Sequence, residues 1–378
     1  MTMTFLFPLL AIVALVISSF SVPLVRRLAL RLGLVDDPEA GTYKTHAQVT
    51  PYGGGISIVL GVLLPSVGAL WWILEVRPYL LWEGDQFLSP WSQETLFPLA
   101  PLSPTILQLS QTVALLLAAL AVFALGLADD WRRLSAGVRL AIQVGVAGVL
   151  AWSVPGFRPA LTGFSGVDMT IAVIWLVSLT NAFNFLDNMN GLSAGVGAIA
   201  IAALASMALA SAHLPGAVLG LLVVGGAGGF LLYNFPRASI FMGDAGGLFL
   251  GFSSGGLALL VCDRLGEVSW GDDVFVTVLP LLCLSVPIYD LISVVSLRLR
   301  RRLPPWHGDT NHISHRLVRQ GLGRVDAVLV IFAGTAVTAA AGVVALIHPT
   351  WAPVSVSAVL IGMICVATVD MRQISQDA

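Results

Sequence analysis

The chain has 378 residues, of which 57% are hydrophobic and only 11% are charged. Globular proteins carry about 25% charged residues, so this composition excludes a soluble enzyme, a nucleic-acid-binding protein and a disordered chain. The net charge of −2 favours no partner, and the three cysteines form no C-x-x-C pair that would indicate a zinc site or a secreted disulfide scaffold. The sequence therefore predicts an integral membrane protein.

Eleven apolar stretches are long enough to be membrane-spanning helices, each of which needs about 20 mostly apolar residues. We expect these spans near residues 4–24, 54–75, 105–128, 137–154, 169–186, 192–211, 216–233, 247–262, 273–297, 326–347 and 353–369. The sixth and seventh spans are separated by a short segment ending in Pro215, which predicts a tight helical hairpin. The basic residues of the first span follow its apolar part, which favours a retained anchor over a cleaved signal peptide. The predicted fold is a single all-α, polytopic bundle over residues 1–378.

The basic residues orient these spans. Only Arg77, Arg158 and Arg264 lie in loops that follow even-numbered spans. The other 16 of the 19 Lys and Arg follow odd-numbered spans or lie in the C-terminal tail: Arg26, Arg27, Arg31, Lys44, Arg132, Arg133, Arg139, Arg237, Arg298, Arg300, Arg301, Arg302, Arg316, Arg319, Arg324 and Arg372. Because basic loops remain in the cytoplasm, we expect the N-terminus outside and the C-terminus inside.

Polar residues that are unusual for a membrane protein gather in five segments, all on the predicted cytoplasmic side. The segments are Lys44–Gly55, Asp129–Arg133, Asn181–Gly191, Asn234–Gly247 and Arg298–Arg324. Acids and amides within a membrane are costly and mark functional sites by default, so the five segments together predict one site.

Several of these residues also have a plainer interpretation. The Asp129-Asp130 pair is either a pair of solvated acids at a helix end or a site for a divalent cation or a proton. Asn181, Asn184 and Asp187 recur at intervals of three and share a broad helix face. That face is either part of a site or an interhelical hydrogen-bond patch.

Three further features leave similar alternatives. Asp244 lies in a glycine-rich turn, which either holds a phosphate or is an ordinary tight turn. Asp290, in the ninth span, is a site candidate or an acid that water reaches near a helix end. His312 and His315 lack other zinc ligands, so we expect them to contact a phosphate, a nucleotide or an acidic neighbour. The run Arg298–Arg302 indicates an orientation signal and an anchor to anionic lipid.

Carboxylates, basic residues and glycine-rich turns at one membrane face suit an anionic, phosphorylated substrate that meets a lipid. Because carboxylates repel phosphates, we expect a Mg²⁺ or Mn²⁺ ion held by one or two carboxylates together with phosphate oxygens. Such an ion would neutralise charge on a diphosphate leaving group.

These clusters, in this order, resemble the polyprenyl-phosphate N-acetylhexosamine-1-phosphate transferases. The matching pieces are Lys44 with Thr50-Pro51 and Gly53-Gly54, Asp129-Asp130, the N-x-x-N-x-x-D pattern at Asn181, Asn184 and Asp187, Met242-Gly243-Asp244, Pro287 with Asp290, and the His312-Ile-Ser-His315-Arg loop. The resemblance implies that an undecaprenyl- or dolichyl-type phosphate reacts with a UDP-sugar to give a lipid-diphosphate sugar and UMP. It also implies a bacterial plasma-membrane enzyme of cell-envelope glycan synthesis, with a cytoplasmic active site. Assembly as a homodimer is compatible with this resemblance.

The resemblance also assigns roles. Asp244 and Asn184 are implied to bind Mg²⁺, Asp129 to act as the base for the lipid phosphate, and Asp130 and Asp187 to complete the catalytic carboxylates. The residues implied to bind substrate are Lys44, Asn181, Asn190, Asp290, His312, His315 and Arg316.

The sequence departs from the family pattern in two places. The family reads D-G-x-D-G where this chain reads Asp187-Asn188-Met-Asn190-Gly191, and it reads H-x-H-H where this chain carries Ser314. The eleven-span layout and the histidine loop favour UDP-GlcNAc, or a closely related UDP-N-acetylhexosamine, as the donor.

Three other functions are alternatives to this one. A phospho-MurNAc-pentapeptide transferase is the alternative within the family. A transporter predicts half-chain symmetry and polar residues at the membrane midplane, and a CDP-alcohol phosphotransferase predicts a D-G-x-x-A-R signature. The sequence carries neither of the last two patterns.

Overall fold

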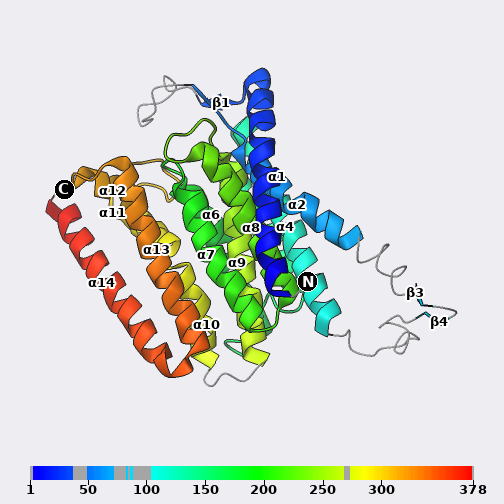
Figure 1. Ribbon diagram of the computed structural model, residues 1–378. Helices are drawn as coiled ribbons and strands as arrows, with labels where there is room; N and C mark the ends of the chain where they lie inside the picture. The colour runs from blue at the N-terminus through cyan, green and yellow to red at the C-terminus, as the bar shows by residue number, and fades with distance from the viewer. Residues whose placement is uncertain are drawn as a thin grey trace.

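Helices form nearly all of the described residues in a computed structural model, which covers residues 3–36, 49–71, 82–83, 86–87, 104–267 and 273–376 (Figure 1). The helices are α1 (Met3–Leu32), α2 (Gly54–Trp71), α4 (Pro104–Arg132), α5 (Ala136–Ser153), α6 (Ser165–Leu186), α7 (Leu192–Ala210), α8 (Leu214–Asn234), α9 (Gly243–Glu267), α10 (Asp273–Cys283), α11 (Ser285–Arg300), α12 (Ile313–Arg319), α13 (Arg324–Ile347) and α14 (Ala352–Gln376), with a 3₁₀ turn at Pro349–Trp351. Two short antiparallel pairs join β1 (Val35–Asp36) to β2 (Thr50–Pro51) and β3 (Trp82–Glu83) to β4 (Gln86–Phe87).

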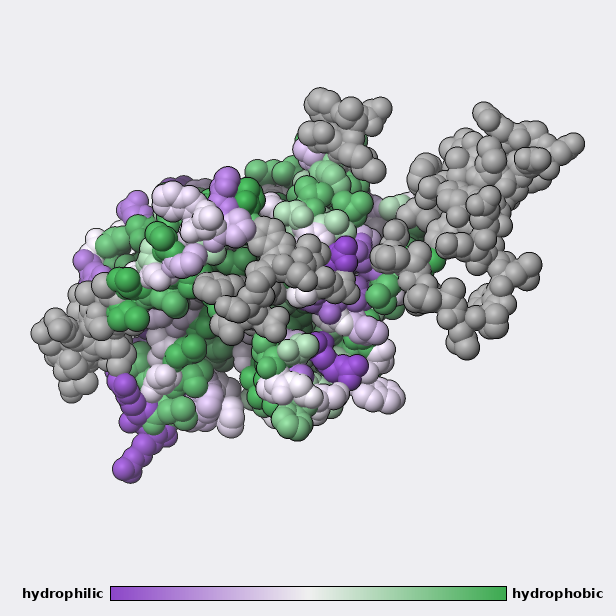
Figure 2. Space-filling view, turned by 90° about the horizontal axis from the view of Figure 1, so that it is seen from below, coloured by the Kyte–Doolittle hydropathy of each residue, from purple (hydrophilic) through white to green (hydrophobic). Residues whose placement is uncertain are grey.

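Within the described ranges, nine helices are long and apolar enough to cross a membrane: α1, α2, α4 to α9, and α13. They coincide with nine of the predicted spans, and the hairpin of α7 and α8 is confirmed. Large apolar side chains face outward, such as Phe20 at 75% and Trp152 at 72% exposed. Seen from below, the described surface is largely apolar or neutral, with hydrophilic residues in small patches (Figure 2). The protein is a multi-pass integral membrane protein.

The predicted span at 273–297 consists of two helices. The structure divides it at Leu284 into α10 and α11. Pro287 lies three residues after the break, and its ring nitrogen cannot donate to the carbonyl of Cys283, as a continuous helix would require. The last predicted span lies in α14, and the apolar helix described there, Pro349–Ile364, is shorter than a full span. Eleven crossings therefore stay a prediction.

Helix α9 lies at the centre of the bundle. In the apolar stretch of α9, 94% of the residues are buried, whereas in that of α5 the share is 22%. Glycines allow its neighbours to approach closely. A Cβ built on Gly126 of α4 would lie 2.4 Å from the Ala245 Cα, and one on Gly55 of α2 would lie 2.5 Å from the Gly246 nitrogen. The start of α9 is therefore held tightly between α2 and α4.

Each end of the bundle carries its own set of polar contacts. At one end, which we call the carboxylate end, lie Asp129, Asp130, Asp187 and Asp244, with strand β2 and helix α12 nearby. At the other end, which we call the glutamine end, Gln111 of α4 contacts His213 and Asp263. The described parts of the five predicted polar segments gather at the carboxylate end, and Lys44 lies outside the described residues.

Candidate active site

The two acids that end α4 point to different partners. Asp129 is 6% exposed; its Oδ2 lies 2.5 Å from Arg139 Nη1, and its Oδ1 accepts a hydrogen bond from the Leu134 amide at 2.6 Å. Asp130 accepts hydrogen bonds from the amides of Asp244 at 2.9 Å and Ala245 at 3.3 Å. A carboxylate at a helix N-terminus satisfies free amides and opposes the positive end of the helix dipole. Asp130 therefore anchors α4 to the start of α9.

Asp244 opens α9 inside this cluster. Its Oδ1 accepts a hydrogen bond from Asn184 Nδ2 at 2.9 Å, and its Oδ2 lies 2.9 Å from Arg139 Nη1. Gly243 has a φ of +78°, and a Cβ there would lie 2.6 Å from Asp130 Oδ2. A glycine is required at this turn because it is both left-handed and crowded. The glycine-rich turn thus places the Asp244 carboxylate beside Asp129.

Arg139 belongs to the same cluster, although it was not among the residues that the sequence pointed to. This residue lies in the first turns of α5, and one of its nitrogens contacts both Asp129 and Asp244. From sequence it was only one of many basic residues on the predicted cytoplasmic side. No local pattern links it to Asp244, which follows 105 residues later. Arg139 is the guanidinium that partly neutralises this group of acids.

Asp187 follows directly after α6, and the described residues offer its carboxylate no hydrogen bond or ion pair. Burial raises its pKa to about 7, and the negative charge of Asp130 adds to this effect. Such a pKa lies well above the ordinary value of an aspartate and places proton exchange near neutral pH. Asp187 therefore supplies a carboxyl group that can either hold or release a proton.

The carboxylate end has the donor atoms for a divalent cation, although the ion must take further ligands from substrate. No three His, Cys, Asp or Glu side chains in the described part of the chain converge as a ready-made metal site. Asp244 and Asn184 lie together, and the guanidinium of Arg139 contacts both Asp244 and Asp129. Mg²⁺ commonly takes one or two protein carboxylates and completes its shell with water and phosphate oxygens. The residues present fit that mode of binding.

Asn181 and Asn190 do not join this cluster. Asn181 Nδ2 donates to Gln143 Oε1 on α5 at 2.6 Å and to the Val177 carbonyl at 2.8 Å. Asn181 thus forms the interhelical hydrogen-bond patch that was one of the two alternatives from the sequence. On the polar face of α6, Asn181 contacts α5 and Asn184 contacts α9. Asn190 Nδ2 donates to the Pro236 carbonyl at 3.2 Å and ties two loops together. Substrate binding by either residue stays a prediction.

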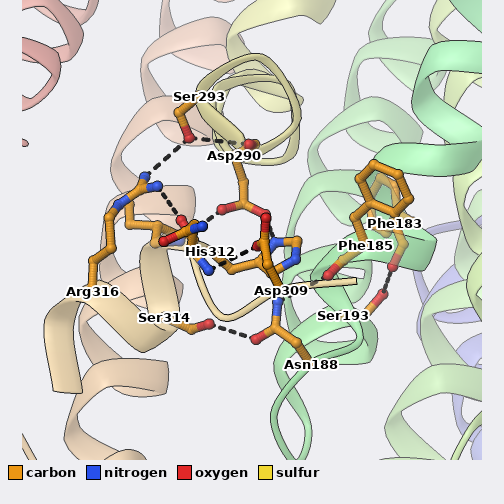
Figure 3. A network of polar contacts seen from close by, with 12 residues as sticks. Phe183, Phe185, Asn188, Ser193, Asp290, Ser293, Asp309, His312, Ser314 and Arg316 are labelled. Atoms are coloured by element: carbon orange, nitrogen blue, oxygen red, sulfur yellow. Dashed lines mark hydrogen bonds and ion pairs between the residues drawn. The ribbon is translucent and has the colours of Figure 1, made fainter. Parts of the chain in front are cut away.

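Asp290 contacts groups of the protein itself, and its predicted contact with substrate stays a prediction. Asp290 is fully buried, and its two oxygens accept from His312 Nδ1 and from the Ile313 amide, both at 2.7 Å (Figure 3). Both carboxylate oxygens are thus used within the protein. Asp290 instead holds the start of α12 and leaves His312 only its Nε2 for another partner.

Arg316 also contacts groups of the protein itself, and its predicted contact with substrate stays a prediction. It is 4% exposed, and it donates to Ser293 Oγ at 3.0 Å and to the Asn311 carbonyl, so it fastens the loop before α12 to α11. Arg298 is 2% exposed, lies 3.0 Å from Asp309 Oδ2 and stacks over the ring of Phe185. The predicted lipid-anchor role therefore does not apply to Arg298.

His312 and His315 face the carboxylate end from α12, with ring centres 6.5 Å apart. Burial lowers the pKa of His315 to about 4, and the neighbouring His312, Arg319 and Arg324 add to this shift. His315 is therefore neutral at neutral pH and can accept or donate a hydrogen bond.

An apolar cavity of about 450 Å³ lies between α1, α2 and α4 and reaches the carboxylate end. Val25, Ala29 and Ile56 line its wall, and Asp130 and Arg132 lie at its polar margin. The carboxylate end is therefore approached by an apolar cavity on one side and by the polar α11–α12 segment on the other.

The described residues form a multi-pass helical membrane bundle with a group of carboxylates, an arginine and two histidines at one end. The profile of glycosyl transferase family 4 matches residues 112–262. A probable undecaprenyl-phosphate N-acetylglucosaminyl 1-phosphate transferase from Bacillus subtilis (strain 168) is 31% identical, over 85% of this chain and 81% of the relative. The chain belongs to glycosyl transferase family 4.

Two other relatives show the breadth of this family. A decaprenyl-phosphate N-acetylglucosaminephosphotransferase from Mycobacterium tuberculosis (strain ATCC 25618 / H37Rv) is 30% identical, over 96% of this chain and 87% of the relative. A phospho-N-acetylmuramoyl-pentapeptide-transferase from Synechococcus sp. (strain JA-3-3Ab) is 36% identical, but over only 42% of this chain and 51% of the relative. The family resemblance predicted from the motifs is confirmed.

Proposed function

We propose that this protein transfers N-acetylglucosamine 1-phosphate from UDP-N-acetylglucosamine to a polyprenyl phosphate and releases UMP. The observation that carries this proposal is the cluster of Asp129, Asp244, Asn184 and Arg139, which lies between an apolar cavity and a polar, histidine-bearing segment. Two relatives named for this type of transfer match most of the chain. One substrate is a lipid, which suits the apolar cavity. The other is a nucleotide sugar, which suits the polar segment.

The proposed reaction is a substitution at phosphorus. An oxygen of the lipid phosphate attacks the phosphorus that bears the sugar, a new P–O bond forms, and the bond from that phosphorus to the oxygen of UMP breaks. UMP leaves with the electron pair of that bond. Asp129 takes up a proton from the attacking phosphate, and Arg139 stabilises negative charge as it develops. Mg²⁺, when held by Asp244 and Asn184, would neutralise charge on the diphosphate.

The cavity supports a lipid as the acceptor, because its apolar wall suits a prenyl chain whose phosphate reaches the carboxylate end. Ala128 lines this cavity, and Ala124 is an equally exposed alanine one turn earlier on α4 that does not line it. Filling the cavity with Ala128→Phe should raise the KM for undecaprenyl phosphate roughly tenfold, as expected for lost apolar contacts. Ala124→Phe is the matched control and should leave this KM unchanged.

We further propose a bacterial plasma-membrane location with the carboxylate end in the cytoplasm, eleven crossings and the N-terminus outside. The split of basic residues supports this orientation. Ser314 is fully buried and is a poor labelling site, whereas Gly308 is exposed in the same segment. A Gly308→Cys variant should react with a membrane-impermeant thiol reagent only from the cytoplasmic side. Labelling only from outside would overturn the orientation.

The function itself is tested with purified protein, Mg²⁺, undecaprenyl phosphate and a panel of UDP-sugars, with release of UMP as the readout. UDP-GlcNAc should support turnover, and omission of the lipid phosphate should stop it. Use of UDP-MurNAc-pentapeptide but not UDP-GlcNAc would change the donor and keep the reaction type. UMP release without a lipid phosphate would overturn the transfer reaction.

A further inference from the structure

The two departures from the family pattern meet in space. Ser314 Oγ donates to Asn188 Oδ1 at 2.5 Å, although the two residues are 126 positions apart (Figure 3). Asn188 follows Asp187 after α6, and Ser314 lies between His312 and His315 at the start of α12. The family has a glycine at the first position and a histidine at the second. We propose that Asn188 and Ser314 are a pair of positioning residues that sets how Asp187 and the two histidines face the nucleotide-sugar donor.

Both side chains are held rigidly. Ser314 is fully buried, and Asn188 Nδ2 also donates to the Phe185 carbonyl at 2.9 Å. Asn188 thus has one hydrogen bond to its own helix end and one to α12. A glycine at position 188 would offer no side-chain oxygen to accept the Ser314 hydrogen bond. The contact between the two segments therefore depends on both side chains.

Phe185 adds a second link between the same two segments. Its ring packs edge-on against His312, with centres 6.2 Å apart, and the Arg298 guanidinium lies 4.9 Å from its centre. The end of α6 and the start of α12 are thus joined at Phe185 and at Asn188. A ligand between Asp187 and the histidines meets a preassembled wall, which lowers the cost of ordering these groups on binding.

This inference rests on the proposed function for the identity of the donor, and its test separates donor binding from chemistry. Asn188→Ala and Ser314→Ala should each raise the KM for UDP-GlcNAc roughly tenfold, because both variants remove the hydrogen bond between the two side chains. Asn188→Ala also removes the hydrogen bond to the Phe185 carbonyl. The kcat at saturating donor and the KM for undecaprenyl phosphate should remain unchanged. The double variant should be no worse than Asn188→Ala, because Ser314→Ala then removes no further contact between the two side chains.

A conservative variant and a matched control make the test more specific. Ser314→Thr keeps the hydroxyl donor, so it should retain a KM near that of the wild type. Ser193 is also a buried serine at 0% exposure, with its hydroxyl donated to the Phe183 carbonyl at 2.8 Å. Ser193→Ala should lower the melting temperature without changing the KM for the donor.

Three outcomes would overturn the pairing: additive effects in the double variant, equal changes in both KM values, or a loss of melting temperature with unchanged KM. Hydrogen exchange of residues 312–319 without substrates provides a readout that is independent of turnover. Asn188→Ala should speed exchange in this segment, and unchanged exchange would also overturn the pairing. If exchange speeds up but the wild type releases no UMP, the proposed function fails while the pairing holds.

Discussion

The two ends of the bundle both bury polar side chains, but they balance charge differently. At the glutamine end, Gln111 donates to the Pro155 carbonyl at 2.9 Å and lies 3.4 Å from Asp263 Oδ2, and its amide oxygen lies 3.3 Å from His213 Nε2. His213 Nδ1 accepts the Gly216 amide at the start of α8. Most of these partners are neutral groups.

At the carboxylate end lie four acids, two of which share the guanidinium of Arg139. Asp129 and Asp244 both depend on Arg139, and Asp187 has no polar partner among the residues described. Buried charges without partners are costly, so an excess of acids persists only where a cation, a proton or a substrate completes the balance. The glutamine end therefore illustrates polar groups that hold helices together, and the carboxylate end illustrates polar groups kept for chemistry.

The largest expected difference between the ends follows removal of one carboxylate from each. Asp244→Asn should lower the turnover rate roughly 10³-fold, because it removes a charge used in transfer while the amide keeps nearly the same shape. The matched variant Asp263→Asn should keep turnover near that of the wild type. Both rates are measured by UMP release, with circular dichroism to confirm folding. Chelation of Mg²⁺ should reproduce the Asp244→Asn loss in the wild type, and full activity after chelation would contradict the metal role.

A smaller difference is expected for the two arginines. Arg139→Gln should reduce turnover roughly 100-fold, because Asp129 and Asp244 lose their shared cation and the developing charge loses its donor. Arg139→Lys should recover part of this loss, since it restores the charge without the planar fork. Arg264, at the other end, donates to the Ser211 carbonyl at 3.0 Å. Arg264→Gln should leave the rate unchanged, and an equal loss in both glutamine variants would remove the distinction.

A closely packed glycine lies near each end of the bundle, so the two ends can also be compared by adding a methyl group at each. A Cβ on Gly126 meets the backbone of α9 at 2.4 Å, whereas one on Gly156, where φ is +91°, meets the side chain of Gln111 at 2.4 Å. Each Gly→Ala variant should lose about 1–3 kcal/mol of stability, as overpacking usually costs. Gly126→Ala should also reduce turnover because it moves Asp244 away from Asp130. Thermal unfolding and UMP release would be compared for both variants, and full activity of Gly126→Ala would show that α9 tolerates the shift.

The smallest expected effect is a dependence of stability on pH. The folded pKa of His315 is about 4, below its ordinary value of about 6.5, so the unfolded chain gains a proton first as the pH falls. The contribution of His315 to stability is complete above pH 6.5 and is lost as the pH falls towards 4. His315→Gln should flatten this part of the melting-temperature profile. His307→Gln, in an exposed position of the same segment, should keep the wild-type slope.

The residues of the site could be predicted from sequence more readily than their partners. The acids Asp129, Asp187 and Asp244 stood out because carboxylates are rare in apolar chains, and the structure brings Asp129 and Asp244 together through Arg139. Asp290 stood out for the same reason, yet its partner is His312, which makes it a support for the loop. The rarity of acids in apolar sequence identifies residues that are unfavourable to bury. It does not identify the partner that stabilises each of them.

The sequence by itself determined the membrane helices, because apolar length and the placement of charges act over one span at a time. Only the tertiary structure decided the break at Leu284, the bridge from Arg139 to Asp244 and the contact between Asn188 and Ser314. The two contacts join residues 105 and 126 positions apart. Their distances depend on how glycine-lined helices pack around α9, and no local pattern records that packing.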